Sequence, residues 1–253
     1  MHKLVSITLL SALLSLGGCG SNPDKSKEKE HQVDVAQESA AKIDTTKAAK
    51  LNLELGLTYL NEGYVERAKS KLNHALKLAP ELSEVHYALG YYYEKVSEYD
   101  QAEKSYRKAI NLNRNGGKEH NNYGAFLCRQ KRYREAEKEF LLALKDPNYV
   151  NTAELYENAG ICVNAIPDIA SASGYFEKSL KHDPRRPTSL LQLALLRWKQ
   201  GNKDEARSLY HLYEDTGERT TQSLWLGIEI AKADGNKDKE ASLKLKLNAQ
   251  SQY

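Results

Sequence analysis

The apolar and polar positions of the 253-residue chain fall into three stretches. Residues 4–16 are apolar almost without interruption, and residues 21–46 then carry almost no bulky apolar side chain. From about residue 48 to the end, small, large apolar and charged residues follow one another in a recurring order. Glycine and proline are few, and Ala, Leu, Glu and Lys are common, which is the profile of an all-helical protein.

The leader has the features of a secretory signal. Lys3 supplies a positive charge, and the apolar run that follows is too short for a membrane span, which needs roughly 20 residues. The run ends in LGGC, residues 16–19, which resembles the lipobox of bacterial lipoproteins. That resemblance implies that residues 1–18 are a lipoprotein signal peptide and that the Cys19 thiol and the new amino terminus are acylated. The alternative is an ordinary secretory signal with a chance cysteine near its end.

The residue after the cysteine bears on the destination of the protein. In the sorting rule of such lipoproteins, an aspartate at that position retains the protein in the inner membrane, and Gly20 stands there instead. The resemblance therefore implies a lipid-anchored protein on the periplasmic face of the outer membrane. We expect residues 19–47 to form the acylated cysteine and a flexible tether, whose coil of about 26 residues reaches roughly 30 Å. No other segment of the sequence is apolar enough to cross a membrane.

Two series of small residues repeat along the rest of the chain with one period. The first series is Gly56, Gly90, Gly124, Gly160 and Ala194, and the second is Ala68, Ala102, Ala136, Ala172 and Ala206. Successive members lie 34 residues apart, except for one spacing of 36 between the third and fourth members of each series. A small residue in each of two successive helices allows the helices to cross closely, and large residues fill the space beside them. These large residues stand four positions after each alanine: Leu72, Tyr106, Phe140, Phe176 and Tyr210.

The repeat resembles the tetratricopeptide repeat (TPR), a pair of helices that stacks on its neighbours. The segment LNLELGLTYLNEGYVERAKSKLNHALKLAP, residues 51–80, matches its small, large and proline positions. The resemblance predicts an all-α fold, a right-handed TPR superhelix of about six helix pairs over residues 48–253. Five clear repeats begin near Ala49, Ser83, Gly117, Ala153 and Pro187. A degenerate sixth pair is expected at about residues 221–249, and the two extra residues of the 36-residue spacing near residues 146–149.

The residue chemistry favours neither catalysis nor nucleic-acid binding. With 37 basic and 34 acidic residues the chain is nearly neutral, which gives no reason to expect nucleic acid as a partner. The sequence has no His-Glu-x-x-His, no Gly-x-Ser-x-Gly and no phosphate-binding glycine loop. His86 and His120 stand at the same repeat position, four residues before a glycine, and are expected to be packing residues. We therefore expect no enzyme activity, no metal site and no cofactor.

Cys128 and Cys162 are the cysteines that remain once Cys19 is acylated. They fall on the first helices of two consecutive predicted repeats, and such helices are neighbours in a TPR stack. Because the periplasm is oxidising, we expect a disulfide between repeats three and four. The alternative is a pair of buried thiols whose Cα atoms lie too far apart for a bridge.

A partner-binding groove is expected on the first helices, which line the concave face of TPR stacks. In that family, positions two, five, nine, twelve and thirteen of a repeat commonly face the groove. In the first two repeats these positions include a row of apolar and aromatic residues: Leu53, Leu57, Leu60, Tyr87 and Tyr91. An exposed row of this kind suits an apolar peptide or an amphipathic helix. The alternatives are that the tether or an N-terminal helix covers the row, or that the alignment is off by one residue.

Three segments narrow the resemblance further. Residues 119–144, 174–187 and 219–232 are similar to the type IV pilus biogenesis lipoproteins of the PilF/PilW family, and the likeness covers nearly the whole mature chain. This resemblance implies a pilotin, a protein that binds subunits of the pilus secretin, carries them to the outer membrane through the lipoprotein sorting machinery and promotes multimerisation. We expect the protein to be monomeric. The alternative function is a periplasm-facing TPR adaptor that docks peptidoglycan enzymes or proteases to the outer membrane.

Overall fold

The computed structural model describes residues 44–166 and 168–250, and within these residues the regular structure is entirely helical. The first helix occupies residues 44–61. The helices that follow are α2 (Val65–Leu78), α3 (Ser83–Lys95), α4 (Tyr99–Leu112), α5 (Gly117–Arg129), α6 (Tyr133–Ala143), α7 (Thr152–Val163), α8 (Ile169–His182), α9 (Pro187–Lys199), α10 (Lys203–Glu214), α11 (Thr221–Ala233) and α12 (Lys237–Gln250). Contacts divide the chain into Met1–Thr45 and Thr46–Tyr253, and from residue 46 onward the helices belong to the second unit.

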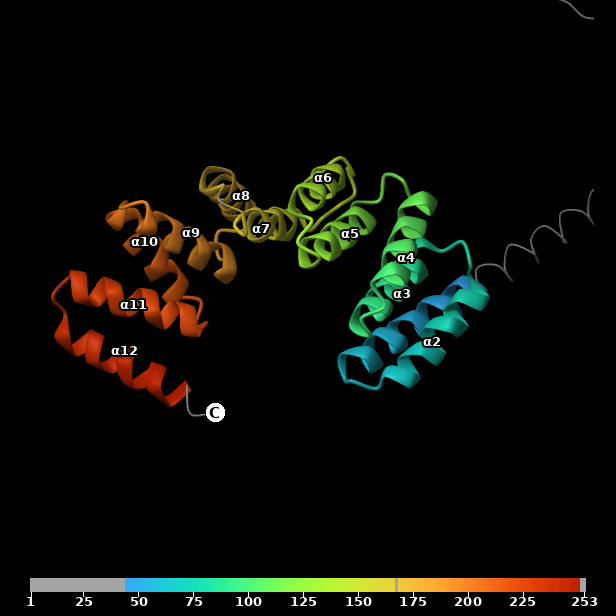
Figure 1. The fold of residues 1–253 in the computed structure, drawn as a ribbon, viewed down its shortest axis with the longest axis horizontal. Coiled ribbons are helices and arrows are strands. Elements are labelled where there is room, and N and C mark those ends of the chain that lie inside the picture. Colours follow the sequence, from blue (N-terminus) through green and yellow to red (C-terminus); the bar gives the residue numbers. More distant parts are fainter. Residues whose placement is uncertain (1–43, 167, 251–253) are drawn as a thin grey trace, which may run out of the picture. The chain divides into compact units, whose positions relative to one another are not determined.

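Consecutive helices of this unit form pairs joined by short turns (Figure 1). α3 packs with α4, α5 with α6, α7 with α8, α9 with α10 and α11 with α12. At four junctions the second helix of a pair also contacts the first helix of the next pair: α2 with α3, α4 with α5, α6 with α7 and α8 with α9. First helices of neighbouring pairs touch as well, because α3 meets α5, α5 meets α7 and α7 meets α9. With helix 44–61 and α2 as the first pair, the described residues hold six pairs, so the predicted all-α architecture is confirmed.

The two series of small residues bring the helices of each pair together. A Cβ atom added to Gly56 would lie 2.8 Å from Leu72 Cγ, and one added to Gly124 would lie 2.8 Å from Phe140 Cε1. Since real Cβ atoms do not approach other atoms so closely, only glycine leaves room for these large side chains. The alanines of the second series are fully buried: Ala68, Ala102, Ala136, Ala172 and Ala206. The predicted series are therefore packing contacts between the helices of a pair.

In five of the six helix pairs, the turn between the two helices has a residue with positive φ at one repeat position. Gly63, Gly201 and Gly235 have φ of 83°, 87° and 69° there, and Ser97 and Lys131 both have φ of 62°. Glycine enters this left-handed region freely, whereas a residue with a Cβ atom pays about 1 kcal/mol. The backbone of the repeat therefore imposes this conformation even where the sequence does not supply glycine.

The two extra residues of the third repeat belong to the connection between α6 and α7. The Asp146 carboxylate in this connection accepts hydrogen bonds from the backbone N–H groups of Gly117 and Asn148, at 2.8 and 2.9 Å. These two hydrogen bonds hold the pKa of Asp146 below its usual value. The Tyr149 ring lies against Gly117, where an added Cβ atom would come within 2.7 Å of Tyr149 Cγ. The insertion is thus folded onto the start of α5.

The N-terminal predictions are only partly covered by the structure. The predicted tether extends to residue 47, but residues 44–47 already belong to the first helix. The predicted signal peptide, Cys19 and the rest of the tether lie outside the described residues. Within the described ranges, no helix combines the length and the apolar character that crossing a bilayer requires.

Candidate protein-binding face

The predicted groove residues lie on the first helices, but they do not form an open apolar row. Leu53 and Leu60 are 6% exposed and Tyr87 is 9% exposed, so all three belong to the hydrophobic core. Leu57 and Tyr91 are half-buried and pack against the same core. The expected exposure of the row is therefore wrong, and a role in binding stays a prediction for these five residues. We call the surface formed by the groove positions of helix 44–61, α3, α5, α7, α9 and α11 the first-helix face.

Neighbouring side chains cover the two tyrosines. The ammonium group of Lys118, on α5, lies 4.7 Å from the centroid of the Tyr87 ring, and that of Lys95 lies 5.2 Å from the centroid of the Tyr91 ring. The Tyr91 hydroxyl also donates a hydrogen bond to Asn61 Oδ1 at 3.5 Å. A cation is attracted to the face of an aromatic ring. A partner that used these tyrosines would therefore have to displace lysines that already occupy their faces.

Buried carboxylates hold neighbouring first helices together. Glu119 is 3% exposed and accepts a hydrogen bond from the Ser83 hydroxyl at 2.7 Å, which ties α5 to α3. Glu157 is 7% exposed and accepts hydrogen bonds from the Ser189 hydroxyl and from Arg186, both at 2.7 Å, which ties α7 to α9 and the residue before it. A buried carboxylate needs such partners because an unpaired charge is costly inside a protein. These polar residues therefore fix the spacing of the repeats.

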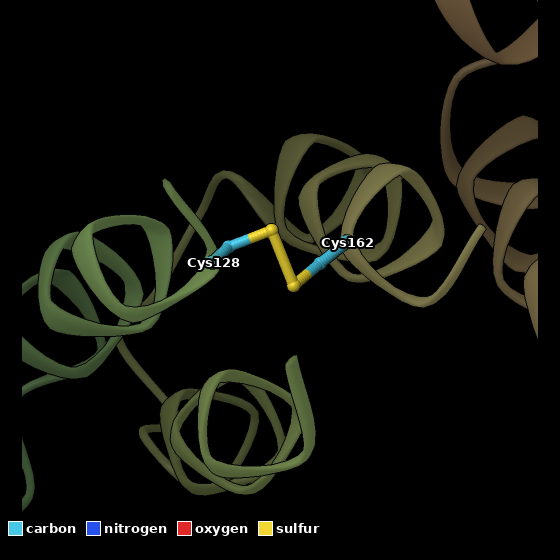
Figure 2. Close-up of a disulfide and its surroundings, with 2 residues drawn as sticks. All are labelled: Cys128 and Cys162. Atoms are coloured by element: carbon cyan, nitrogen blue, oxygen red, sulfur yellow. A yellow bond between two sulfur atoms is a disulfide. The ribbon is translucent and has the colours of Figure 1, made fainter. Parts of the chain in front are cut away.

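A disulfide links the third and fourth repeats. Cys128 on α5 and Cys162 on α7 are joined in the structure, with their Cα atoms 5.6 Å apart (Figure 2). This separation lies within the usual range for a disulfide, and the alternative of two distant thiols does not describe the structure. The bridge closes a loop with a sequence separation of 34 residues. By the chain-entropy estimate such a loop stabilises the folded state by about 3–4 kcal/mol.

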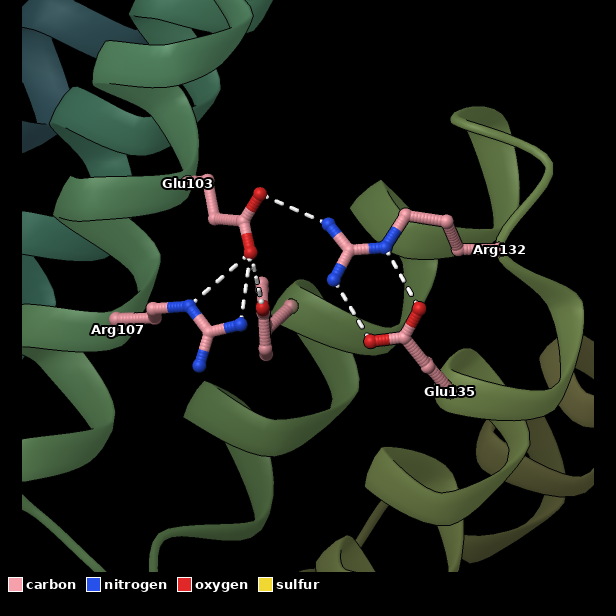
Figure 3. Close-up of polar contacts among 5 residues, drawn as sticks. Glu103, Arg107, Arg132 and Glu135 are labelled. Atoms are coloured by element: carbon pink, nitrogen blue, oxygen red, sulfur yellow. Dashed lines mark hydrogen bonds and ion pairs between the residues drawn. The ribbon is translucent and has the colours of Figure 1, made fainter.

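A cluster of charged side chains joins the second and third repeats (Figure 3). The Glu103 carboxylate of α4 accepts hydrogen bonds from Arg107, from Arg132 and from the Tyr123 hydroxyl, each at 2.8 Å. Arg132 is in turn paired with Glu135 at 2.7 Å. Burial alone would raise the pKa of Glu103, but the hydrogen bonds from the two arginines outweigh it and lower the pKa to about 2. The cluster connects α4 with α5 and α6 through side-chain contacts, and the sequence analysis did not identify it.

The first-helix face is open at its C-terminal end. A cavity of about 570 Å³ lies between the starts of α9 and α11, and its walls include Thr188, Leu191 and Gln222. Trp225, one helical turn after Gln222, is 56% exposed. Thr188 and Leu191 occupy positions two and five of the fifth repeat, so the cavity lies on the predicted groove side. This end combines a hollow with a large exposed aromatic ring.

The two histidines have structural contacts. His86 Nε2 lies 2.7 Å from the Pro80 carbonyl oxygen. His120 lies 2.6 Å from Glu139 through Nδ1 and 3.0 Å from the Arg114 carbonyl oxygen through Nε2. The hydrogen bond to Glu139 raises the pKa of His120 above its usual value. Across residues 44–166 and 168–250, no group of three His, Cys, Asp or Glu side chains is arranged to hold a metal ion.

The sequence analysis missed Trp225 and the residues around the C-terminal cavity. The sequence could have identified Trp225, because the groove positions counted in the first two repeats can also be counted in the sixth pair. Counted from Thr221, position two is Gln222 and position five is Trp225. The poor match of this pair to the TPR pattern hid the correspondence.

Family models identify the repeats. Tetratricopeptide-repeat models match residues 49–82, 83–115 and 168–218, which confirms the predicted TPR fold. Such repeats form protein-interaction scaffolds in general.

Known proteins extend the likeness over most of the chain. The type IV pilus assembly protein PilF of Pseudomonas aeruginosa is 36% identical over 195 residues, which is 77% of each chain. The solved structure of Pseudomonas aeruginosa PilF superposes with a TM-score of 0.77 at 35% identity, over 82% of this chain and 93% of that one. The crystal structure of PilW, a type IV pilus biogenesis factor, superposes with a TM-score of 0.71 at 27% identity, over 81% of this chain and 94% of that one.

Proposed function

Because the chain belongs to the family of the type IV pilus assembly protein PilF, we propose that it is the pilotin of a type IV pilus system. It is an outer-membrane lipoprotein that binds subunits of the secretin, brings them to the outer membrane and promotes their multimerisation. The observation that carries this proposal is the 36% identity with PilF over 77% of the chain. The first helices α3, α5, α7 and α9 contact one another in sequence and so form a stack.

The lipid anchor, the polar segment and the TPR unit each suit one step of pilotin function. Acylation of Cys19 anchors the protein in the membrane, and the polar segment after it lets the TPR unit reach subunits in the periplasm. The helix pairs supply an extended surface with repeating positions, which is how TPR arrays recognise a chain segment of another protein. Because the secretin subunit has to be released into the ring, this surface binds it reversibly.

The disulfide supports the periplasmic location in this proposal. Disulfides form and persist in oxidising compartments, and the bacterial periplasm is one of them. The bridge between Cys128 and Cys162 would be reduced in the cytoplasm of most bacteria. A leader with a lipobox and a disulfide in the mature domain therefore favour the same compartment.

The test is secretin assembly in a strain that lacks this gene. Inner and outer membranes are separated and run without boiling, and the secretin is detected with an antibody. We expect heat-resistant multimers to disappear from the outer membrane and monomers to collect in the inner membrane. Normal, correctly placed multimers would contradict the proposal.

The lipid anchor is tested by complementation of the same strain. Cys19→Ala removes the acylated thiol, so the variant should leave the membrane fraction and fail to restore multimers in the outer membrane. Cys128→Ser serves as the matched control, because it removes a cysteine without removing the anchor and should stay in the membrane fraction. Unchanged membrane retention of Cys19→Ala would show that the lipoprotein interpretation is wrong.

A further inference from the structure

A hollow distinct from the C-terminal cavity lies where α3, α5 and α7 begin. Its volume of about 460 Å³ is within the range of ligand sites, about 300–1,000 Å³. Glu84, Lys118 and Glu154 line it, and each occupies position two of its repeat. The folded insertion between α6 and α7 contributes residues 148–150 to the wall. This hollow, which we call the central hollow, therefore lies on the predicted groove side.

Carboxylates outnumber cations in the walls of the central hollow. Among the described residues, four carboxylates and one ammonium group line it: Glu84, Glu119, Asp146, Glu154 and Lys118. Lys50 adds a second ammonium group from outside the wall, 3.2 Å from the Glu84 carboxylate. The carboxylates still exceed the ammonium groups by two. A cation that entered the hollow would therefore gain opposite charge in return for its lost hydration.

Glu154 is the carboxylate of this set with free capacity. Glu119 accepts a hydrogen bond from the Ser83 hydroxyl, and Asp146 accepts two from backbone N–H groups. The half-buried Glu154 side chain takes part in no ion pair or hydrogen bond with another described residue. Arg186, the arginine of the adjoining hollow, is paired with Glu157 at 2.7 Å instead. The Glu154 oxygens are thus available to a ligand.

Carboxamides supply unused hydrogen-bond donors at the same place. Asn121 is 7% exposed, and its Oδ1 accepts a hydrogen bond from Asn158 Nδ2 at 3.1 Å, but its own Nδ2 has no partner within the described residues. This nitrogen is not enclosed, as the unpartnered Tyr213 hydroxyl is, so it is accessible from the hollow that it lines. Asn151 also lines the hollow and, although it is the N-cap residue of α7, its side chain accepts no capping hydrogen bond. Since unpaired polar groups in a largely buried side chain are costly, a ligand with hydrogen-bond acceptors would stabilise this wall.

The arrangement of the carboxylates distinguishes between kinds of cation. A metal ion needs several ligand atoms around one point, and no three His, Cys, Asp or Glu side chains in the described ranges are arranged to hold one. A lysine or arginine side chain pairs with a single accessible carboxylate, which Glu154 provides. Backbone carbonyls beside such a residue supply the acceptors that the Asn121 carboxamide lacks. An extended peptide segment with a basic residue meets both requirements.

The central hollow continues toward the C-terminal end of the first-helix face. Part of its wall, within residues 150–154, is shared with the adjoining hollow, which reaches Arg186. The next residue, Pro187, lines the C-terminal cavity, where the one charged residue among the described lining residues is Glu218, again a carboxylate. One extended segment can therefore follow the starts of α5, α7, α9 and α11 toward the exposed Trp225.

We propose that the central hollow is the docking site for an extended segment of the secretin subunit that carries a lysine or arginine. The basic side chain pairs with Glu154, and a backbone carbonyl of the segment accepts a hydrogen bond from Asn121 Nδ2. The segment then continues along the face to the C-terminal cavity, where it packs on Trp225. This inference rests on the proposed function, and it names the chemistry by which the face recognises the subunit.

The experiment measures binding of the mature, full-length protein, purified in detergent, to the purified periplasmic part of the secretin from the same organism. Glu154→Gln keeps the shape of the side chain and removes its charge, so it should weaken binding about tenfold, as expected for one hydrogen bond to a charged group. Asn121→Ala removes the unpartnered nitrogen and should weaken binding about fivefold. Glu66→Gln is the matched control, since Glu66 is an exposed carboxylate on α2 outside the hollow, and should bind like the wild type.

The outcomes separate this inference from the proposed function. If the wild type binds and Glu154→Gln binds equally tightly, or Glu66→Gln loses as much affinity, the docking site is wrong and the pilotin proposal stands. If the wild type itself does not bind the secretin, both fall. Circular dichroism shows whether Asn121→Ala is folded, and Glu154→Gln, which breaks no contact within the described residues, tests the site by itself if it is not.

Charge reversal on an array of overlapping secretin peptides tests the chemistry of the segment. The strongest signals with the wild type should come from peptides that contain Lys or Arg, and Glu154→Lys should lose them because like charges repel. The same peptides with Glu in place of the basic residue should bind Glu154→Lys and not the wild type. Signals from peptides without a basic residue, no recovery in the reversed pair, or an array without signal would overturn the assignment.

Discussion

The two ends of the first-helix face have similar groove residues and different surroundings. In the first two repeats, the groove positions hold Leu53 and Tyr87, which are buried under neighbouring side chains. In the last two pairs, the same positions hold Leu191, which is also buried although it borders a cavity, and the exposed Trp225. Of these four residues, Leu53, Tyr87 and Leu191 belong to the core, and Trp225 remains accessible. The residue type at a groove position does not determine its exposure, because the next repeat decides what covers it.

Between the two ends, the first helices are tied to one another by covalent and polar contacts. The Cys128–Cys162 disulfide and the Glu157 carboxylate fix α5, α7 and the start of α9 relative to one another. This middle part is held by a covalent bond and buried polar contacts. Substitutions along the face distinguish core residues from binding residues.

Loss of the disulfide should have the largest effect on stability. The double variant Cys128→Ser, Cys162→Ser should lose about 3–4 kcal/mol of unfolding free energy, because the unfolded chain regains the freedom of a 34-residue loop. Urea denaturation at one protein concentration measures the change. The wild type in reductant is the matched control and should unfold at the urea concentration of the double variant. Equal stability of the oxidised wild type and the double variant would show that the two cysteines are not bridged.

Two substitutions, one at each end of the face, should separate an effect on stability from an effect on binding. Leu60→Ala empties a buried position at the N-terminal end and should cost about 2–3 kcal/mol of unfolding free energy, with secretin affinity of the folded chain unchanged. Trp225→Ala removes an exposed side chain and should change stability by less than about 0.5 kcal/mol while it weakens binding. Denaturation and binding titrations on both variants give the comparison. A loss of affinity in folded Leu60→Ala with none in Trp225→Ala would reverse the roles of the two ends.

The stability of the third repeat should depend on pH through His120. Its pKa is raised in the folded state, chiefly by the hydrogen bond to Glu139. A raised pKa means that folding favours the protonated ring, so the contribution is complete below the ordinary histidine pKa of about 6.5 and disappears as pH rises through the folded-state pKa. The unfolding free energy should therefore fall as pH increases above about 6.5. His120→Gln, which cannot titrate, should reduce this slope, and an identical slope in both proteins would contradict the assignment.

The smallest expected effect concerns the turn at Lys131. With φ of 62°, this residue adopts a conformation that favours glycine, so Lys131→Gly should raise the unfolding free energy by about 0.5–1 kcal/mol. Lys131→Ala keeps the Cβ atom and should leave stability unchanged. Thermal melts of both variants decide whether the gain comes from the backbone. A gain of equal size in Lys131→Ala would attribute it to loss of the charge.

Much of the fold could be predicted because each helix pair is specified by small and large residues that lie close together in the sequence. The spacing of Gly56 and Ala68 and of their equivalents specifies helix pairs, and α3, α5 and α9 begin at the predicted residues. The disulfide followed from the same spacing, since Cys128 and Cys162 fall on adjacent first helices. The residues that pack the two helices of a repeat against each other lie close together in the sequence.

The surface of the face could not be predicted in the same way. Tyr87 is covered by Lys118 from the next repeat, and Glu103 pairs with Arg132 on another helix. Such contacts depend on side-chain directions between repeats, which the spacing of small residues does not specify. The unpartnered hydroxyl of Tyr213 likewise became visible only with the neighbouring helices in place.

Site-specific photo-crosslinking in living cells tests most directly where the face binds its partner. A photoreactive phenylalanine replaces either Thr221, beside the C-terminal cavity, or Leu57, on the N-terminal end of the face, and cells that produce the secretin are irradiated. We expect a crosslink to the secretin from position 221 and none from position 57. A crosslink from position 57 alone would contradict it, because the partner would then lie on the end that the structure shows to be covered.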